Sequence, residues 1–262
     1  MVFVLAFCIC FFASVVGAIC GIGGGVIIKP VLDAFGIMDV ATISFLSGCT
    51  VLSMTAYSVG RSKLSGTSHV EGHTALPLAI GAAVGGVVGK SLFQVIRNAS
   101  GNPSMVGAIQ AACLLVVTVG TLVYTLLKSH IPTHKVSNVP ACIMIGLVLG
   151  VMSSFLGIGG GPINLVVLFY FFSMDTKTAA ENSLYIILFS QVASLIASIV
   201  SGTVPDFSWG MLILMVCGGI GGGICGRAVN KKLDTKAVDR LFIGLMALII
   251  LINIYNIYKF VG

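Results

Sequence analysis

The sequence predicts an all-α polytopic membrane protein built from two homologous halves. Of its 262 residues, 57% are hydrophobic and only 8% are charged, whereas a soluble domain carries about 25% charged residues. Uncharged runs long enough to cross about 30 Å of hydrocarbon recur along the chain. The pentapeptide G-I-G-G-G at positions 21–25 returns unchanged at positions 157–161. These observations favour a duplicated bundle of membrane-spanning helices.

Eight uncharged runs are predicted to be full spans, because one crossing needs about twenty apolar residues. The first is expected to be a retained span, since no basic segment precedes its apolar core. No large soluble domain is expected, and the basic residues between runs should set orientation in the lipid bilayer rather than bind nucleic acid. The eight runs lie near residues 2–20, 40–60, 73–93, 104–127, 139–156, 182–204, 207–226 and 241–258.

Two shorter apolar stretches, 24–36 and 160–173, follow the glycine clusters directly. A helix that continued from the first span through the glycines would be about 51 Å long, which is too long for one crossing. Glycine also costs about 1 kcal/mol relative to alanine inside a helix. The chain is therefore predicted to turn or break at both clusters. Paired breaks in two halves of a chain indicate a transporter's binding site.

The duplication extends beyond the glycine clusters, which align Gly21 of the first half with Gly157 of the second. Residues 1–128 and 138–262 are predicted to be two repeats joined by a linker, residues 129–137. Glycines at every fourth position, which let helices pack closely in lipid, form one stripe in each repeat. The matching segments are Met38-Asp39 with Met174-Asp175, Ser65-Gly66-Thr67 with Ser201-Gly202-Thr203, and Gly81, Gly85, Gly89 and Lys90 with Gly218, Gly222, Gly226 and Arg227.

Three cationic segments predict the orientation, because basic loops stay in the cytoplasm. They contain Arg61 and Lys63, Lys128 and Lys135, and Arg227 to Lys236. All three face the cytoplasm if each glycine-flanked stretch adds one short crossing. Each half then has about five crossings, four full spans plus one short glycine-broken segment, and an odd number makes the halves inverted repeats. The predicted loop from Lys90 to Arg97 is the exception, because this arrangement leaves it outside.

Polar residues inside the apolar runs are the candidate site residues. Lys29 lies in the first short stretch, where a buried cation is usually functional, although a lysine can also reach the interface with its stem. Asn164 lies beside the position equivalent to Lys29. Ser47 and Ser183 are repeat-equivalent, which favours a shared cavity over simple bonds to carbonyls one turn back. His69, Glu71 and His73 have a spacing that could hold a metal, but are interpreted as loop residues.

The two halves resemble the TauE/SafE family of predicted sulfite and organosulfonate exporters, which is also grouped with toluenesulfonate uptake permeases. The resemblance rests on G-x-G-G-G leading into a short stretch with Pro30 in one half and Pro162 in the other. Members often carry Thr-Ser in the span after each break. This chain has Leu46-Ser47 and Asn182-Ser183 there, so half of the hydroxyl pair is kept.

The resemblance implies a secondary transporter in the cytoplasmic (inner) membrane, with a sulfur oxyanion as substrate. Helix N-termini after the glycines offer unpaired N–H groups and a partial positive charge to such an anion. No cofactor or metal is expected, and Glu181 is the candidate relay for a coupling proton. The candidate substrate-binding residues are Gly23, Gly24, Gly25, Lys29, Ser47, Gly159, Gly160, Gly161, Asn164, Asn182 and Ser183.

Two other classes of protein remain open. A passive anion channel could use the same glycine-flanked helices, and countertransport or proton dependence in proteoliposomes distinguishes the two. An intramembrane enzyme needs a nucleophile with a base, and no span contains a Ser or Cys together with a His at a suitable depth. Cys20 adjoins the first glycine cluster, but Leu156 occupies the equivalent position in the second, so a thiol mechanism would be one-sided.

Overall fold

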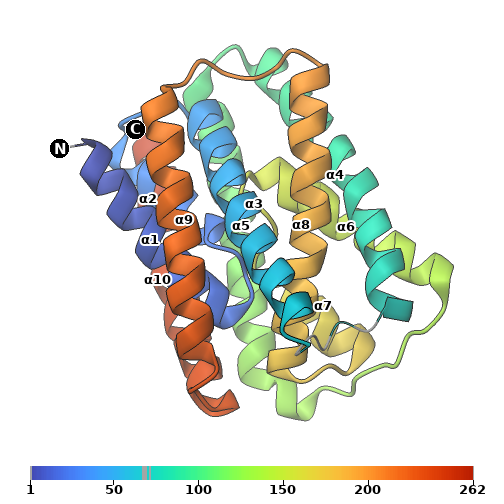
Figure 1. The fold of residues 1–262 in the computed structure, drawn as a ribbon. Coiled ribbons are helices and arrows are strands. Elements are labelled where there is room, and N and C mark those ends of the chain that lie inside the picture. The colour runs from blue at the N-terminus through green and yellow to red at the C-terminus, as the bar shows by residue number, and fades with distance from the viewer. Residues whose placement is uncertain (1, 67–69, 71, 262) are drawn as a thin grey trace.

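The computed structural model describes residues 2–66, 70 and 72–261, and their regular structure is entirely helical (Figure 1). Thr67, His69 and Glu71 lie outside the described residues. His73 was interpreted as a loop residue, but it lies in the first turn of the helix that begins at Gly72. The helices are α1 (Val2–Cys20), α2 (Gly25–Phe35), α3 (Val40–Leu64), α4 (Gly72–Ser100), α5 (Pro103–Leu127), the 3-10 helix η1 (Lys128–His130), α6 (Val139–Leu156), α7 (Pro162–Phe172), α8 (Thr176–Val200), α9 (Trp209–Asn230) and α10 (Thr235–Val261).

Eight of these helices are long and apolar enough to cross a membrane, which confirms the predicted polytopic fold. The predicted boundaries were wrong at several ends. α8 begins at Thr176 rather than near residue 182, and α10 at Thr235 rather than near 241. Charged residues ended the predicted runs, but a helix continues through them because its backbone bonds do not depend on side-chain charge. For the same reason Lys90 and Arg97 lie inside α4 and not in a loop.

Both glycine clusters break the helix, as predicted. α1 ends at Cys20, and Gly21 and Gly23 adopt φ angles of 74° and 71°. In the second cluster Gly159 and Gly160 have φ angles of 74° and 118°. Glycine reaches these left-handed conformations without the steric cost that a Cβ imposes. The chain then starts the two short helices, α2 and α7, which have 11 residues each.

The helices after the short ones begin with the same cap. Asp39 accepts hydrogen bonds from the backbone N–H groups of Ala41 and Thr42, and Asp175 from those of Lys177 and Thr178. Burial raises the pKa of the Asp175 carboxyl, but hydrogen bonds from the hydroxyl and N–H of Thr178 outweigh this and hold the pKa below its usual range. The matching Met-Asp segments are therefore N-caps.

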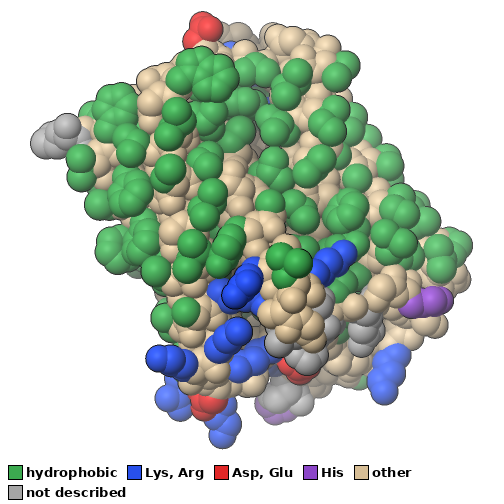
Figure 2. Space-filling model, in the orientation of Figure 1, with side chains coloured by type: hydrophobic (Ala, Val, Ile, Leu, Met, Phe, Trp, Pro, Cys, Tyr) green, Lys and Arg blue, Asp and Glu red, His purple; other side chains and the backbone are tan. Residues whose placement is uncertain are grey.

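Lysine and arginine side chains gather at one end of the molecule, called here the basic end (Figure 2). Lys128, Lys177 and Arg227 lie at this end. Polar contacts join the helices there. Lys128 Nζ lies 2.7 Å from Asp239 Oδ2 on α10, and the Lys177 ammonium on α8 donates to the Leu233 carbonyl at 2.8 Å. At the opposite end, Lys259 near the end of α10 donates to the Ala34 carbonyl on α2 at 3.0 Å.

α3 and α8 run in opposite directions, and so do α5 and α10. The start of α3 lies at the opposite end, where the Thr42 hydroxyl donates to the Asp206 carbonyl after α8 at 3.1 Å. α8 therefore begins at the basic end and finishes where α3 begins. α5 finishes at the basic end, beside Lys128, whereas α10 begins there.

Glycine stripes join the two halves. α4 packs along α6 and α9 along α1, as the right and left sides of Figure 1 show. A Cβ at Gly85 would collide with the Leu147 carbonyl of α6, and one at Gly222 with the Phe11 carbonyl of α1. Leu147 and Phe11 are themselves equivalent when the two glycine clusters are aligned. The stripes act in helix packing, as predicted.

Candidate functional site

The two glycine clusters meet at the centre of the fold and are together called the glycine junction, residues 21–25 and 157–161. A Cβ at Gly25 would collide with the Ile158 carbonyl of the opposite cluster. A Cβ at Gly161 would lie 3.7 Å from Cβ of Val26 in the first turn of α2. The absence of side chains thus lets the two breaks come into backbone contact, which a Cβ would prevent.

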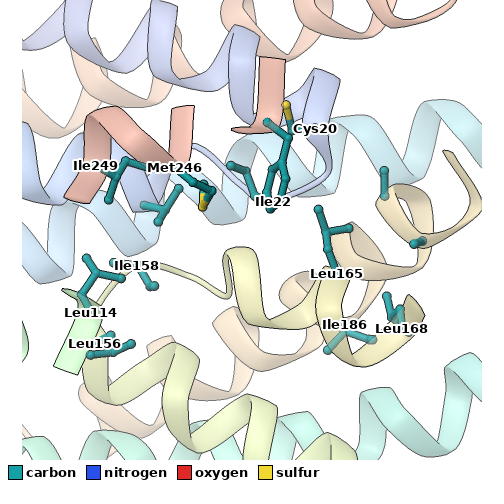
Figure 3. Packing of buried hydrophobic residues seen from close by; sticks show 14 of the residues in the cluster. Cys20, Ile22, Leu114, Leu156, Ile158, Leu165, Leu168, Ile186, Met246 and Ile249 are labelled. Atoms are coloured by element: carbon teal, nitrogen blue, oxygen red, sulfur yellow. The ribbon is translucent and has the colours of Figure 1, made fainter. Parts of the chain in front are cut away.

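The isoleucine in the middle of each cluster anchors its break in the apolar core. Ile22 and Ile158 are fully buried in one cluster of side chains drawn from both halves (Figure 3). Their neighbours there include Leu165 of α7 and Met246 of α10. The glycines therefore turn the chain while the isoleucines hold each turn in place.

The short helices begin at the junction without side-chain caps. Neither Gly24, before α2, nor Gly161, before α7, provides a capping hydrogen bond from a side chain. This contrasts with the Asp caps of α3 and α8. The first N–H groups of a helix have no partner within it, although Pro162 in α7 has no N–H to offer. The N–H groups of Ile27 and Asn164 already donate to the Gly24 and Gly161 carbonyls of their own first turns. The two helix N-termini thus bring the N–H groups of Gly25, Val26 and Ile163, together with a partial positive charge, to one place.

Two aliphatic side chains close the junction. Val51 of α3 and Ile187 of α8 are fully buried and occupy equivalent positions in the two aligned halves. Val51 lies against Gly159, since a Cβ there would be 2.7 Å from Val51 Cγ1, and Ile187 lies against Gly160. The junction is therefore tightly packed, and a ligand can enter it only if the two breaks separate.

The predicted polar residues are buried in the helices around the junction. Ser47 and Ser183 are completely buried, and neither hydroxyl has a hydrogen-bond partner among the described residues. Asn164 is equally buried and adjoins the junction, because a Cβ at Gly160 would lie 3.1 Å from Asn164 Nδ2. The amide of Asn182 instead donates to the Thr178 carbonyl of its own helix at 2.8 Å.

Lys29 has a partner that the sequence interpretation missed. Its ammonium lies 2.6 Å from Asp33 Oδ2, and both side chains are at most 5% exposed. The pair sits on one face of α2 at i,i+4 spacing, a signal present in the sequence. Lys29 is therefore neutralised within its own helix and is not an isolated cation.

Two cavities flank the junction. The larger, about 420 Å³, opens towards the basic end and is called the basic vestibule. The smaller, about 30 Å³, lies on the other side of the junction and is called the far cavity. The basic vestibule is lined by Ala18, Ser58, Val59, Ser62, Val70, Lys177, Ala180, Glu181, Leu184, Arg227, Asn230 and Lys231. The far cavity is lined by Ser44, Phe45, Gly48, Cys49, Lys90, Phe93, Gln110, Ser154, Gly157, Gln191, Ser194, Leu195 and Ser198.

Each cavity touches one of the breaks. A Cβ at Gly21 would collide with Ala180 in the wall of the basic vestibule. A Cβ at Gly157 would lie 2.7 Å from Ser44 Oγ in the wall of the far cavity. The cavities are thus separated by the glycine junction with Val51 and Ile187.

A family model described as "Sulfite exporter TauE/SafE" matches residues 6–252. The chain belongs to the TauE/SafE family. It is also similar to a protein named "Probable membrane transporter protein YunE" from Bacillus subtilis (strain 168), with 30% identity over 117 residues. That alignment spans 45% of this chain and 41% of the relative. No solved structure matches the chain.

This TauE/SafE protein is therefore a multi-pass membrane protein of a transporter family, in agreement with the resemblance noted in the sequence. Its structure brings the doubled glycine motif into one junction and places Ser47, Ser183 and Asn164 in the surrounding helices. Glu181 lies in the wall of the basic vestibule, next in the chain to Ala180, which meets Gly21 of the junction. The sequence interpretation missed Val51 and Ile187, whose only sequence signal is their equivalent position after the two breaks.

Proposed function

We propose that this TauE/SafE protein is a secondary transporter that moves a small anion, sulfite or another sulfur oxyanion such as an organosulfonate, across the cytoplasmic membrane by alternating access. The observation that carries the proposal is the meeting of two uncapped helix N-termini at the junction. The buried hydroxyls of Ser47 and Ser183, which have no partner among the described residues, lie one helical turn before Val51 and Ile187. Such N-termini favour anions through their free N–H groups and their dipoles. The family match supports a transporter of this kind.

The proposed mechanism treats residues 1–128 and 138–262 as inverted repeats joined by residues 129–137. The opposite directions of α3 and α8, and of α5 and α10, support this arrangement. The basic end faces the cytoplasm, because basic segments are retained there. Repeats of this kind can rock against each other around a site at their interface.

In this mechanism the anion enters through the basic vestibule, where Lys177, Arg227 and Lys231 attract it. The two breaks then separate, and the anion meets the N–H groups of the first turns of α2 and α7. Ser47 and Ser183 complete the contacts with neutral donors. Lys29 contributes no net charge because Asp33 balances it. Glu181 is the proposed proton relay, since its carboxylate lines the vestibule.

A carrier fits the packed junction better than a passive channel does. A channel needs a continuous polar path, whereas Val51 and Ile187 place two fully buried aliphatic side chains between the cavities. Dewetted apolar constrictions block ions. Conduction would therefore require the same separation of the breaks that substrate transfer requires in a carrier.

Counterflow in proteoliposomes tests the proposal. Liposomes loaded with unlabelled sulfite should accumulate radiolabelled sulfite transiently. Liposomes loaded instead with thiosulfate, sulfoacetate, sulfate or lactate show whether these anions also drive the uptake. Ser47→Ala and Ser183→Ala should each weaken sulfite binding by about 2- to 10-fold, as expected for one lost hydrogen bond. Ser53→Ala is the control, because its hydroxyl donates to the Cys49 carbonyl of α3 at 2.9 Å.

The outcomes separate the alternatives. Accumulation driven by internal sulfite, with weaker binding in the two site variants only, supports the carrier. Electrical conductance without counterflow would support a channel instead. If none of the anions in the panel drives counterflow when it is loaded inside the liposomes, the proposed substrate class is contradicted.

A further inference from the structure

The far cavity repeats most of the wall positions of the basic vestibule. Nine of the twelve residues that line the basic vestibule have their repeat counterpart in the wall of the far cavity. On α8 and α3 the aligned glycine clusters make Ala180 the counterpart of Ser44. On α9 and α4 the aligned glycine stripes make Arg227 the counterpart of Lys90. The same wall is therefore built twice, once on each side of the glycine junction.

The two cavities differ mainly in how far they are open. The basic vestibule has a volume of about 420 Å³, whereas the far cavity has about 30 Å³. A buried water needs about 10–15 Å³ of such volume, so the far cavity has room for very few waters. One open and one closed copy of the same wall is the arrangement that a rocking carrier has when it faces one side of the membrane.

Lys90 is the charged residue in the wall of the far cavity. It is 9% exposed, and its ammonium forms no ion pair or hydrogen bond within the described residues. It lies 5.4 Å from the centroid of the Phe93 ring. The hydroxyls of Ser44 and Ser154, in the same wall, also have no partner among the described residues. The described part of this wall contains no acidic residue.

Neither orientation nor packing accounts for this cation. Lys90 lies in the half of α4 towards the end opposite the basic end, where the orientation rule does not call for a basic residue. Its ring contact returns only part of the cost of taking an ammonium out of water. A buried charge of this kind inside a membrane helix is usually functional. The equivalence with Arg227 indicates which function.

We infer that the far cavity is the closed form of a second anion vestibule, in which Lys90 and the hydroxyls of Ser44 and Ser154 bind the transported oxyanion from the end opposite the basic end. This inference rests on the proposed transport of a small oxyanion. Opening the far cavity rehydrates Lys90, whose ammonium then attracts the anion as Arg227 does at the other end. Lysine suits a site that closes on an anion, because its ammonium is a compact charge on a flexible stem.

Transport measured separately from each side tests the inference. Right-side-out and inside-out membrane vesicles expose the two ends of the protein to external sulfite in turn. Lys90→Gln should raise the half-saturating sulfite concentration about 10- to 100-fold on the side of the far cavity, and change it less than about 2-fold on the side of the basic vestibule. Arg227→Gln should have the opposite sidedness. Lys90→Arg should restore most of the affinity on the far side.

Arg97→Gln is the matched control, because it removes the same charge from an exposed position on the same helix. Thermal unfolding in detergent provides a second measurement. Lys90→Met should unfold at the wild-type temperature or higher, since it removes a buried cation that has no partner among the described residues. A lower unfolding temperature for Lys90→Met, or equal effects of Lys90→Gln on both sides, would overturn the inference while leaving the proposed function intact. Failure of the wild-type protein to transport sulfite from either side would instead contradict the proposed function.

Discussion

Adding a methyl group to Gly85 tests whether the two halves are joined by backbone contact. In Gly85→Ala the new Cβ collides with the Leu147 carbonyl of α6. The carbonyl cannot turn away, because it belongs to helical backbone and accepts a hydrogen bond within α6. α4 cannot shift locally either, since Gly81 and Gly89, one turn away on each side, approach α6 in the same way. The two helices must therefore move apart.

The expected cost follows from two opposing effects. Overpacking of a well-packed contact costs about 1–3 kcal/mol, and the better helix propensity of alanine returns about 1 kcal/mol. Gly120→Ala on α5 isolates the second effect, because no atom lies within 4 Å of a Cβ at that position. Gly120→Ala should thus be stabilising by up to about 1 kcal/mol. The difference between the two variants should be about 1–3 kcal/mol.

Thermal unfolding of purified protein in one detergent measures this difference. We expect the unfolding temperature to rise in the order Gly85→Ala, wild type, Gly120→Ala. Gly222→Ala should resemble Gly85→Ala, because its Cβ meets the Phe11 carbonyl of α1 in the same way. If Gly85→Ala and Gly120→Ala unfold at the same temperature, the close contact of α4 with α6 is not part of the folded protein.

Three further predictions concern a cap, an ion pair and the barrier. Asp175→Ala should lower stability by about 1 kcal/mol at neutral pH. The native pKa of Asp175 is held below the ordinary value of about 3.9. The loss of stability should therefore persist above pH 4 and shrink as the pH falls below 4. A loss that is the same at pH 7 and pH 3 in melting experiments would refute the role of the charge. Lys29→Met leaves Asp33 buried alone and should cost about 3–5 kcal/mol, whereas the double variant with Asp33→Leu should recover the yield of monodisperse protein; no recovery would mean that the pair is not coupled. Val51→Ala or Ile187→Ala should speed the leak of sulfite from loaded liposomes, and wild-type leak rates would show that these side chains do not form the barrier.

Much of the fold could be predicted because its signals are local. Twenty apolar residues in a row predict a span wherever they occur, and clustered glycines predict a break. Both predictions were confirmed, at Cys20 and Leu156 where α1 and α6 end. Helix ends were less predictable. Charge marks where a side chain prefers water, whereas the backbone of α8 continues from its cap at Asp175 through Lys177.

The candidate site was only partly predictable. The doubled glycines indicated its centre, and the junction confirms that the two breaks meet. Lys29 was interpreted without Asp33, although their spacing in one helix was visible in the sequence. Lys90 was assigned to a loop because it followed an apolar run. Its burial in α4 depends on helices α3, α6 and α8, whose side chains complete the wall of the far cavity.

The sequence by itself therefore determined the membrane class, the eight spans and the positions of both breaks. Each of these depends on the hydrophobicity or backbone freedom of residues adjacent in the chain. Only the tertiary structure decided that the first helix of each half packs on the fourth helix of the other, and that two equivalent cavities, one open and one closed, flank the junction. In lipid, apolar faces differ little in hydrophobicity, so partners are chosen by the close fit of surfaces far apart in the sequence.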